Sequence, residues 1–142
     1  MKTPVKIVLA IVLFVILAGI VVAFYLYNLK PKDLNRARPD YTLTASDLLK
    51  YFEENESVAT AKYVNKIVEV SGEISSVKPG ENNSLNISLK TDNANSSVIC
   101  TLAKAADPSA FKAGSRISVR GVCSGYLLDV LLNNCTIPET SR

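Results

Sequence analysis

The chain has 142 residues and a formal net charge of +3, from 16 Lys and Arg against 13 Asp and Glu. It contains no histidine, which removes the commonest general base, the commonest metal ligand and the Ser-His and Cys-His nucleophile systems. The three cysteines show no C-x-x-C spacing, so no zinc set is predicted. We therefore expect no metal, no cofactor and no enzymatic activity.

The excess positive charge belongs to the N-terminal part of the chain. Residues 1–39 carry six basic side chains against one acidic one, whereas residues 40–142 carry ten basic against twelve acidic. A nucleic-acid binder usually carries its basic excess on the folded domain, because neutralisation of phosphates supplies much of its affinity. The charge distribution therefore argues against nucleic acid as the ligand.

Residues 7–27 are the most apolar stretch, IVLAIVLFVILAGIVVAFYLY. A helix of that length covers roughly 30 Å, the hydrocarbon thickness of a bilayer. Lys2 and Lys6, in the tail 1–6, resemble the charged start of a secretory signal, but such signals have an apolar core of only about 7–15 residues. We therefore favour an uncleaved transmembrane anchor that contacts the lipid bilayer over a cleaved signal.

Residues 28–40 read as a basic juxtamembrane linker, with two prolines and four Lys or Arg. Its cations are within reach of anionic lipid headgroups. The count of positive charges tilts slightly towards a cytoplasmic domain, because two lysines precede the span and four basic residues follow it. The very short N-terminal tail and the three cysteines, which suit an oxidising compartment if two are bridged, favour the opposite orientation. We predict a single span with a periplasmic domain; the cytoplasmic orientation is the alternative.

Residues 41–142 form the predicted folded domain, and its first element is a helix. Thr44 provides a hydroxyl for the N-cap, with an acid at Asp47 three residues on. One apolar face is expected to point inward, formed by Leu48, Leu49 and Phe52. A second short helical or turn segment is expected over 57–63, with its inward residues at Val58, Ala61 and Tyr63.

From residue 66 onward, apolar residues recur at every second position, which predicts strands. The residues expected to point inward are Val68, Val70, Ile74, Leu85, Ile87, Leu89, Val98, Cys100, Leu102, Ile117, Val119, Cys123, Leu128, Val130 and Leu132. Gly72 predicts a bend in the first strand, and Asn133-Asn134 predicts a register shift in the fifth. The connector 104–114 has room for one helical turn.

This pattern predicts a mainly β fold, a five-stranded OB-type Greek-key barrel with a preceding α-helix, attached to one N-terminal transmembrane helix. A small β-sandwich is the alternative.

Two motifs in this domain are similar to those of a known family. The first is Ala59-Thr60-Ala61-Lys62-Tyr63-Val64-Asn65-Lys66, followed by Val68-Glu69-Val70-Ser71-Gly72. The second runs from Val119-Arg120-Gly121-Val122-Cys123 to Asp129-Val130-Leu131-Leu132-Asn133-Asn134-Cys135. Together they resemble the opening and closing motifs of the tRNA-anticodon-like OB-fold family of bacterial envelope proteins. The resemblance covers residues 43–137 and implies an OB barrel on an exported or membrane-tethered protein. Many relatives are lipoproteins, and this chain lacks the cysteine that they lipidate.

Nucleic-acid binding is the first function to weigh, because OB barrels often bind single strands. Such sites use aromatic platforms on the strands and a basic groove. The predicted strands contain no Phe, Tyr or Trp. The cations of the domain are scattered over three predicted strands, at Lys66, Lys90, Arg116 and Arg120. We keep a membrane-tethered nucleic-acid-binding protein as the alternative function.

An enzyme and a binding module remain to be compared. Asp129, Glu69 and Glu73 are the candidate acids or bases, but alternate carboxylates on a half-buried strand are ordinary surface residues. We therefore expect a membrane-anchored binding or scaffolding module of the bacterial cell envelope, with an unidentified protein, peptide or glycan ligand. Tyr63 and Tyr126 are the candidate ligand contacts, and packing in the core or at the barrel rim is the alternative for both.

The cysteines offer one candidate disulfide. Cys100 has an inward phase on the third predicted strand, and the third and fifth strands of an OB barrel are neighbours. A bridge from Cys100 to Cys135 is therefore expected ahead of one from Cys123 to Cys135, because a simple hairpin register does not place the second pair opposite each other.

Overall fold

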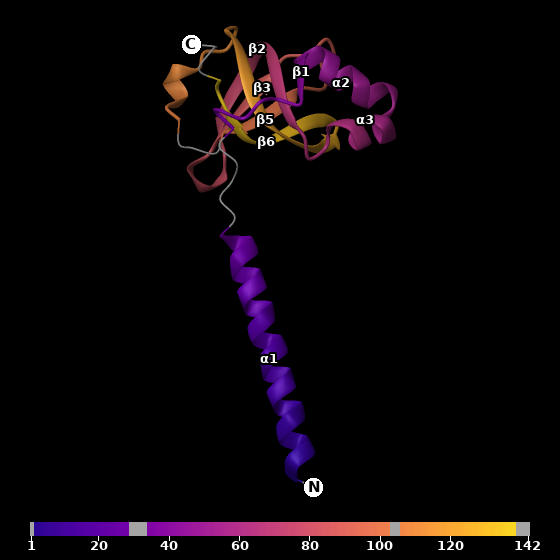
Figure 1. Ribbon diagram of the computed structural model, residues 1–142. Helices are drawn as coiled ribbons and strands as arrows, with labels where there is room; N and C mark the ends of the chain where they lie inside the picture. Colours follow the sequence, from indigo (N-terminus) through magenta and orange to yellow (C-terminus); the bar gives the residue numbers. More distant parts are fainter. Residues whose placement is uncertain (1, 29–33, 103–105, 139–142) are drawn as a thin grey trace. The chain divides into compact units, whose positions relative to one another are not determined.

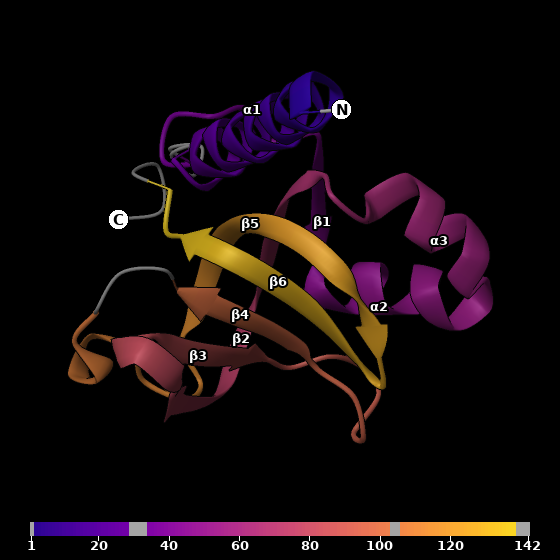
Figure 2. The ribbon, with the colours of Figure 1, turned by 90° about the horizontal axis from the view of Figure 1, so that it is seen from below.

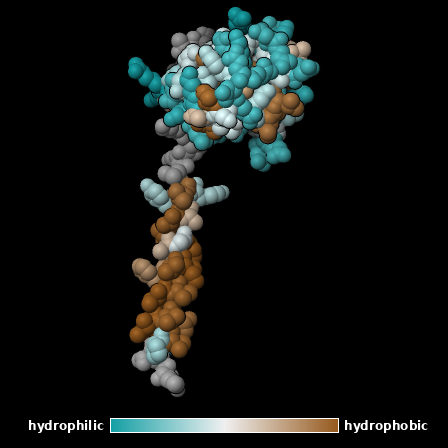
Figure 3. Space-filling model, turned by 90° about the vertical axis from the view of Figure 1, so that its right-hand side faces the viewer, coloured by the Kyte–Doolittle hydropathy of each residue, from teal (hydrophilic) through white to brown (hydrophobic). Residues whose placement is uncertain are grey.

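The computed structural model describes residues 2–28, 34–102 and 106–138. The chain forms two compact units, residues 1–31 and residues 32–142. The first unit is one helix, α1 (Lys2–Tyr27), which is long and apolar enough to cross a membrane by its length and composition. Figure 3 shows that the surface of α1 is hydrophobic almost throughout, whereas the visible face of the second unit is mostly hydrophilic.

The second unit is built on five strands that close into a barrel (Figures 1 and 2). They are β2 (Ile67–Pro79), β3 (Leu85–Leu89), β4 (Val98–Leu102), β5 (Arg116–Leu127) and β6 (Asp129–Thr136). Hydrogen-bonded neighbours follow the order β2-β3-β4-β6-β5, and β5 pairs with β2 to close the barrel. All these pairs are antiparallel except β4–β6, which is parallel. The predicted OB barrel is confirmed, and the closure excludes the β-sandwich.

Strand β2 is long enough to pair with two neighbouring strands, one along each half of its length. Residues 67–73 pair with β5, and residues from Ile74 onward pair with β3, with a register shift between Ile74 and Ser76. Gly72 lies just before this exchange, where an added Cβ would stand 3.2 Å from Ala45 Cβ and 3.3 Å from Leu89 Cβ. The glycine therefore lets β2, α2 and β3 approach closely at the point where β2 changes partners.

A short strand, β1 (Tyr41–Thr44), precedes the helices and pairs in parallel with residues 68–71 of β2. This strand is not among those expected from the sequence. Four residues with only two apolar side chains give too weak an alternation to be distinguished from a linker. Its backbone pairing depends on β2, which lies more than twenty residues later in the chain.

Helices α2 (Ala45–Glu54) and α3 (Glu56–Tyr63) pack at one end of the barrel (Figure 1). Thr44 caps α2 as predicted, because its Oγ1 accepts a hydrogen bond from the Asp47 amide at 3.1 Å. The predicted inward face of α2 is also confirmed, with Leu48, Leu49 and Phe52 buried.

The inward face predicted for the second helix is wrong at two positions. Val58 is 60% exposed and Ala61 is exposed, whereas Ala59 and Tyr63 are buried. Asn55 Oδ1 accepts from the Val58 amide and starts the helix at Glu56, one residue earlier than expected. The buried face then follows the spacing of four residues from Ala59 to Tyr63.

The barrel core consists of the inward residues of all five strands together with α2 and α3. Its members include all three cysteines. One predicted member is wrong, because Leu128 is 73% exposed and has a φ of +74° in the turn between β5 and β6. The connector 104–114 was expected to have room for one helical turn, and a short 3₁₀ turn spans Pro108–Ala110. Residues 103–105 lie outside the described part.

Residues 34–40, in the predicted linker, are held on the outside of the barrel. Leu34 is only 2% exposed. Arg120 Nη1 donates to the carbonyls of Leu34 at 3.2 Å and Ala37 at 2.7 Å, and Asp40 exchanges hydrogen bonds with the Ile67 backbone. The remainder of the predicted linker includes residues 29–33, outside the described part, so the domain boundaries stay predictions.

Candidate functional site

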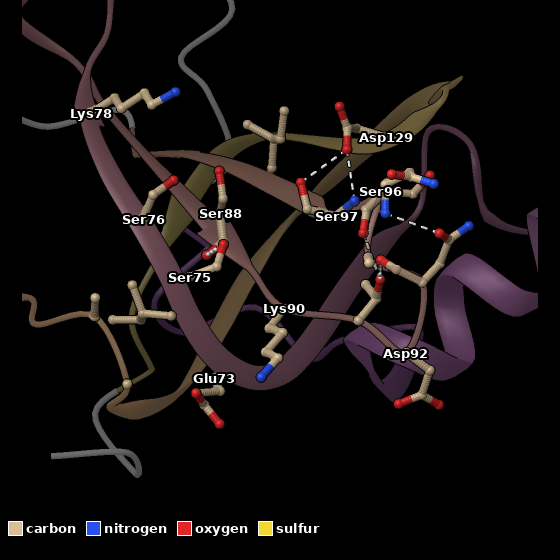
Figure 4. Close-up of a pocket in the computed structure, with 18 residues that line it drawn as sticks. Glu73, Ser75, Ser76, Lys78, Ser88, Lys90, Asp92, Ser96, Ser97 and Asp129 are labelled. Carbon is tan, nitrogen blue, oxygen red and sulfur yellow. Dashed lines mark hydrogen bonds between the residues drawn. The ribbon is translucent and has the colours of Figure 1, made fainter.

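A groove of about 820 Å³ crosses the outer surface of the barrel over β2, β3 and β4, and this is the candidate site (Figure 4). Ligand sites in proteins typically have volumes of about 300–1,000 Å³. The face over the second and third barrel strands is also where OB folds bind oligonucleotides and oligosaccharides. Here those two strands are β3 and β4, which contribute Ser88 and Ile99; most of the lining comes from β2 and from the loop 90–97.

The floor of the groove is lined by hydroxyl side chains because the strands alternate. Ile74 and Leu89 point into the core, so Ser76 and Ser88, which are register partners, lie on the outer face. Ser75 Oγ donates to the Ser88 carbonyl at 3.1 Å. Within the described residues, the Ser76 and Ser88 hydroxyls have no hydrogen-bond partner. They are therefore available to a ligand.

One rim of the groove is the loop from Lys90 to Ser97, which is fixed by its own hydrogen bonds. Thr91 Oγ1 lies 3.0 Å from the Asn93 carbonyl and 2.6 Å from the Ser96 carbonyl, and is buried with Ser96. Asn93 Nδ2 donates to Glu53 Oε1 at 2.7 Å, which ties the loop to α2. The rim is therefore a preformed wall.

Asp129, a candidate acid in the sequence, fixes the other end of this loop. Its Oδ1 accepts from the Ser97 amide at 2.6 Å and from Ser97 Oγ at 2.9 Å. A carboxylate with two donors on one oxygen holds the loop against β6. This role is structural, although the residue also lines the groove.

The charges in the groove nearly balance. Lys78 and Lys90 face Glu73, Asp92 and Asp129, and none of the described residues that line the groove is aromatic. The groove therefore offers hydrogen-bond donors and acceptors of both signs. It has no platform on which a base could stack.

The other candidate acid, Glu69, is committed to an ion pair. Its Oε2 lies 2.6 Å from Arg120 Nη2 and 3.1 Å from Arg120 Nε, and both side chains are mostly buried. Of the four scattered cations, Lys90 lines the main groove, Arg120 is paired, and Lys66 and Arg116 lie outside the main groove. Lys90 and Arg116 together line a smaller pocket, but Glu73 and Asp92 line it as well, so the pair does not form a basic patch.

The two candidate tyrosines lie outside the groove. Tyr63 is 1% exposed and packs at 5.0 Å, centroid to centroid, against Tyr41. Tyr126 stacks on Phe52 at 5.6 Å. The expectation that strands carry no aromatic residue was wrong, because Tyr41 lies in β1 and Tyr126 in β5.

Lys62 lies against three tyrosine rings at the α2–α3 end. Its Nζ is 5.1 Å from the Tyr63 centroid, and 5.5 and 5.6 Å from those of Tyr41 and Tyr51. A hydrogen bond with Tyr63 and the nearby phenols raise the pKa of Lys62, because they favour the charged ammonium. This cluster closes the end of the barrel through packing.

The described residues contain no cluster of three or more His, Cys, Asp or Glu side chains that could hold a metal ion. The groove was missed from the sequence, although one signal was present. Serine stands at outward positions of two neighbouring strands, and an Asn- and Ser-rich loop follows the second of them. Only the register shows that these hydroxyls share a face.

A family model named tRNA_anti-like matches residues 1–137. The chain belongs to the tRNA_anti-like family. No curated protein matches the chain.

Among solved structures, the chain is similar to a "putative nucleic acid-binding lipoprotein" from Klebsiella pneumoniae subsp. pneumoniae MGH 78578. That match has a TM-score of 0.56 and 20% identity, and covers 68% of this chain and 91% of that one. A "putative aspartyl-tRNA synthetase" from Leishmania major Friedlin matches with a TM-score of 0.44 and 13% identity, over 75% of this chain and 20% of that one. The first likeness supports the OB fold.

Proposed function

We propose that this tRNA_anti-like chain is a membrane-anchored binding module of the bacterial cell envelope. Helix α1 is the anchor, and the serine-lined groove holds the ligand. The observation that carries the proposal is a preformed groove that borders the face used by OB folds, with hydroxyls at Ser76 and Ser88 that have no partner among the described residues. The lipoprotein named among the structural neighbours supports an envelope location.

The chemistry of the groove favours a neutral, polar ligand such as a peptide or a glycan. Ligands of this kind present amide and hydroxyl groups that alternate as donors and acceptors, which matches serine and asparagine side chains. Two lysines against three carboxylates give no net attraction for a polyanion. We propose that α1 is oriented with its N-terminus inside and that the barrel is periplasmic.

The test is site-specific photocrosslinking in membranes. A photoreactive amino acid at Ser88, on the floor of the groove, is expected to capture a ligand from the envelope. The same group at Ser118, on the outer side of β5 and outside the groove, is the matched control. Equal capture at both positions, or capture at Ser118 only, would contradict the groove as the site.

Nucleic acid is the second candidate, and one observation favours it. The neighbour in Klebsiella is named as nucleic acid-binding, and Lys78 and Lys90 line the groove of this chain. The candidate predicts that the full chain in detergent binds single-stranded oligonucleotides, with an affinity that falls steeply as salt rises. Lys78→Gln with Lys90→Gln would then abolish retention. No retention of labelled oligonucleotides at low salt would exclude this candidate.

A further inference from the structure

Two of the three buried cysteines are in contact inside the barrel. Cys100 on β4 is 0% exposed, and Cys135 on β6 is 2% exposed. Strands β4 and β6 are parallel neighbours, and the two thiols, both on the inner face, are close enough to interact. That contact, together with burial, raises the pKa of the Cys100 thiol well above its ordinary value.

The side chain of Cys135 points inward because of an irregularity in β6. Leu132 is buried and pairs with Cys100, and strict alternation would place Cys135, three residues later, on the outer face. Asn134 has a φ of +52°, and the ladder register shifts so that Cys135 pairs with Leu102. The extra residue returns Cys135 to the inner face, diagonally across from Cys100.

Gly121 on β5 provides the space that the sulfur of Cys135 occupies. A Cβ at this position would clash with Cys135 Sγ and stand 3.1 Å from the Asn133 carbonyl oxygen. Any other residue would therefore displace either the sulfur or the backbone of β6. Cys135 Sγ also donates to the Leu132 carbonyl at 3.3 Å, so the thiol is held in one place.

Cys123 serves as an internal comparison. It is also buried, but its pKa is raised by burial, with an opposing backbone hydrogen bond at Gly125 and no contribution from another thiol. Its register partner on β6 is Leu132. Cys123 therefore lacks the thiol neighbour that Cys100 has in Cys135.

We propose that Cys100 and Cys135 form a disulfide across β4 and β6 in the mature protein, and that Cys123 stays a free thiol. The reaction is an exchange with an external disulfide, either a protein dithiol oxidant or oxidised glutathione. Each cysteine gives up one proton and one electron as the new S–S bond forms. The S–S bond of the oxidant breaks, and it leaves as two thiols that carry both electrons and both protons.

The bridge joins two strands that are neighbours in the barrel but distant in the chain. The connector, β5 and most of β6 lie between Cys100 and Cys135, so the bond would fix a contact of high sequence separation. Both sulfurs are inaccessible in the folded barrel. The bond therefore forms while the barrel folds or while it opens locally.

The experiment uses the full chain, unfolded with reductant and refolded in detergent with reduced and oxidised glutathione. Refolded protein, verified by circular dichroism, is denatured and treated with a maleimide of high mass, before or after reduction. The proposal predicts one addition before reduction and three after it, with peptide mapping that joins Cys100 to Cys135. Cys123→Ala should give none before reduction and two after it, and Cys100→Ala two in both cases.

Thermal unfolding gives a second readout that does not depend on labelling. Relative to the chain refolded with reductant alone, the oxidised chain should unfold at a midpoint higher by roughly 10 °C or more. Three additions before reduction in refolded protein would overturn the proposal. So would a mapped Cys123–Cys135 bridge. Because refolding takes place in vitro, neither result depends on the membrane orientation or on the groove.

Discussion

The two halves of β2 present the same kind of sequence to the outside of the barrel but meet different surroundings. In the first half, residues 67–73, the outward Glu69 is paired with Arg120, which also donates to the carbonyls of the segment 34–37. In the second half, residues 74–79, the outward serines border the open groove. One half is used to attach the preceding chain and the other is free for a ligand.

The comparison shows what decides between attachment and binding. Both halves place polar residues outward between buried or half-buried apolar ones, although the register shift in the second half puts Ser75 and Ser76 outward in succession. The difference is the partner strand. The first half faces β5, which supplies Arg120, and the second half faces β3, which supplies Ser88. Four predictions separate the two halves, in order of decreasing effect on stability.

Arg120→Ala should have the largest effect. It leaves the Glu69 carboxylate mostly buried without its cation and removes the donor to the Leu34 and Ala37 carbonyls. We expect a loss of about 2–4 kcal/mol in the free energy of unfolding, measured by chemical denaturation. Arg116→Ala, on the same strand and exposed, is the control and should stay within about 0.5 kcal/mol. Equal losses would show that the attachment does not depend on the ion pair.

Leu34→Ala tests the apolar part of the same attachment. The side chain is 2% exposed, so its truncation should cost about 2–3 kcal/mol and make residues 34–40 more sensitive to limited proteolysis. Leu127→Ala is the matched control, because that leucine is 80% exposed. A protease pattern that does not change would mean that Leu34 adds little to holding this segment.

Asp129→Ala tests the rim of the groove. It removes the acceptor of the Ser97 amide and hydroxyl, which should cost about 1–2 kcal/mol and lower crosslinking at Ser88. Asp107→Ala is the control, because the Asp107 carboxylate interacts with the Ser109 hydroxyl and accepts from the Ser109 amide, which together lower its pKa, but Asp107 lies outside the groove. Unchanged capture in the Asp129 variant would separate the loop from ligand binding.

The double substitution Ser76→Ala with Ser88→Ala should have the smallest effect on stability. Neither hydroxyl has a partner among the described residues, so the change in unfolding free energy is expected within about 0.5 kcal/mol. Retention of the ligand found by crosslinking should nevertheless fall clearly. A loss of stability without a loss of retention would assign the two serines to the fold.

The confirmed sequence predictions share a local cause. The cap at Thr44 depends on an amide only three residues away, and the inward residues of β3 and β4 follow from strict alternation within five residues. The apolar helix α1 depends on its own composition. In each case the sequence within one element carries the whole signal.

The wrong or missing predictions share a cause that is not local. The exposure of Val58 depends on which residue caps α3. The exposure of Leu128 depends on the tight turn between β5 and β6, in which its φ is +74°. Strand β1 exists only because β2 offers a parallel edge. The groove depends on the register of strands that are distant in the chain, and so could not be read from any one of them.

The apolar helix, the alternating strands of a small barrel and the family can all be read from the amino-acid sequence, because each depends on a short-range pattern or on motif spacing. The tertiary structure alone decided that one half of β2 is attached to the preceding segment and the other borders the groove. It also decided that Asn134 returns Cys135 to the core beside Cys100, in the space that Gly121 leaves. Alternation within a strand determines on which side of the sheet a side chain lies, whereas the register between strands determines which residue lies opposite it.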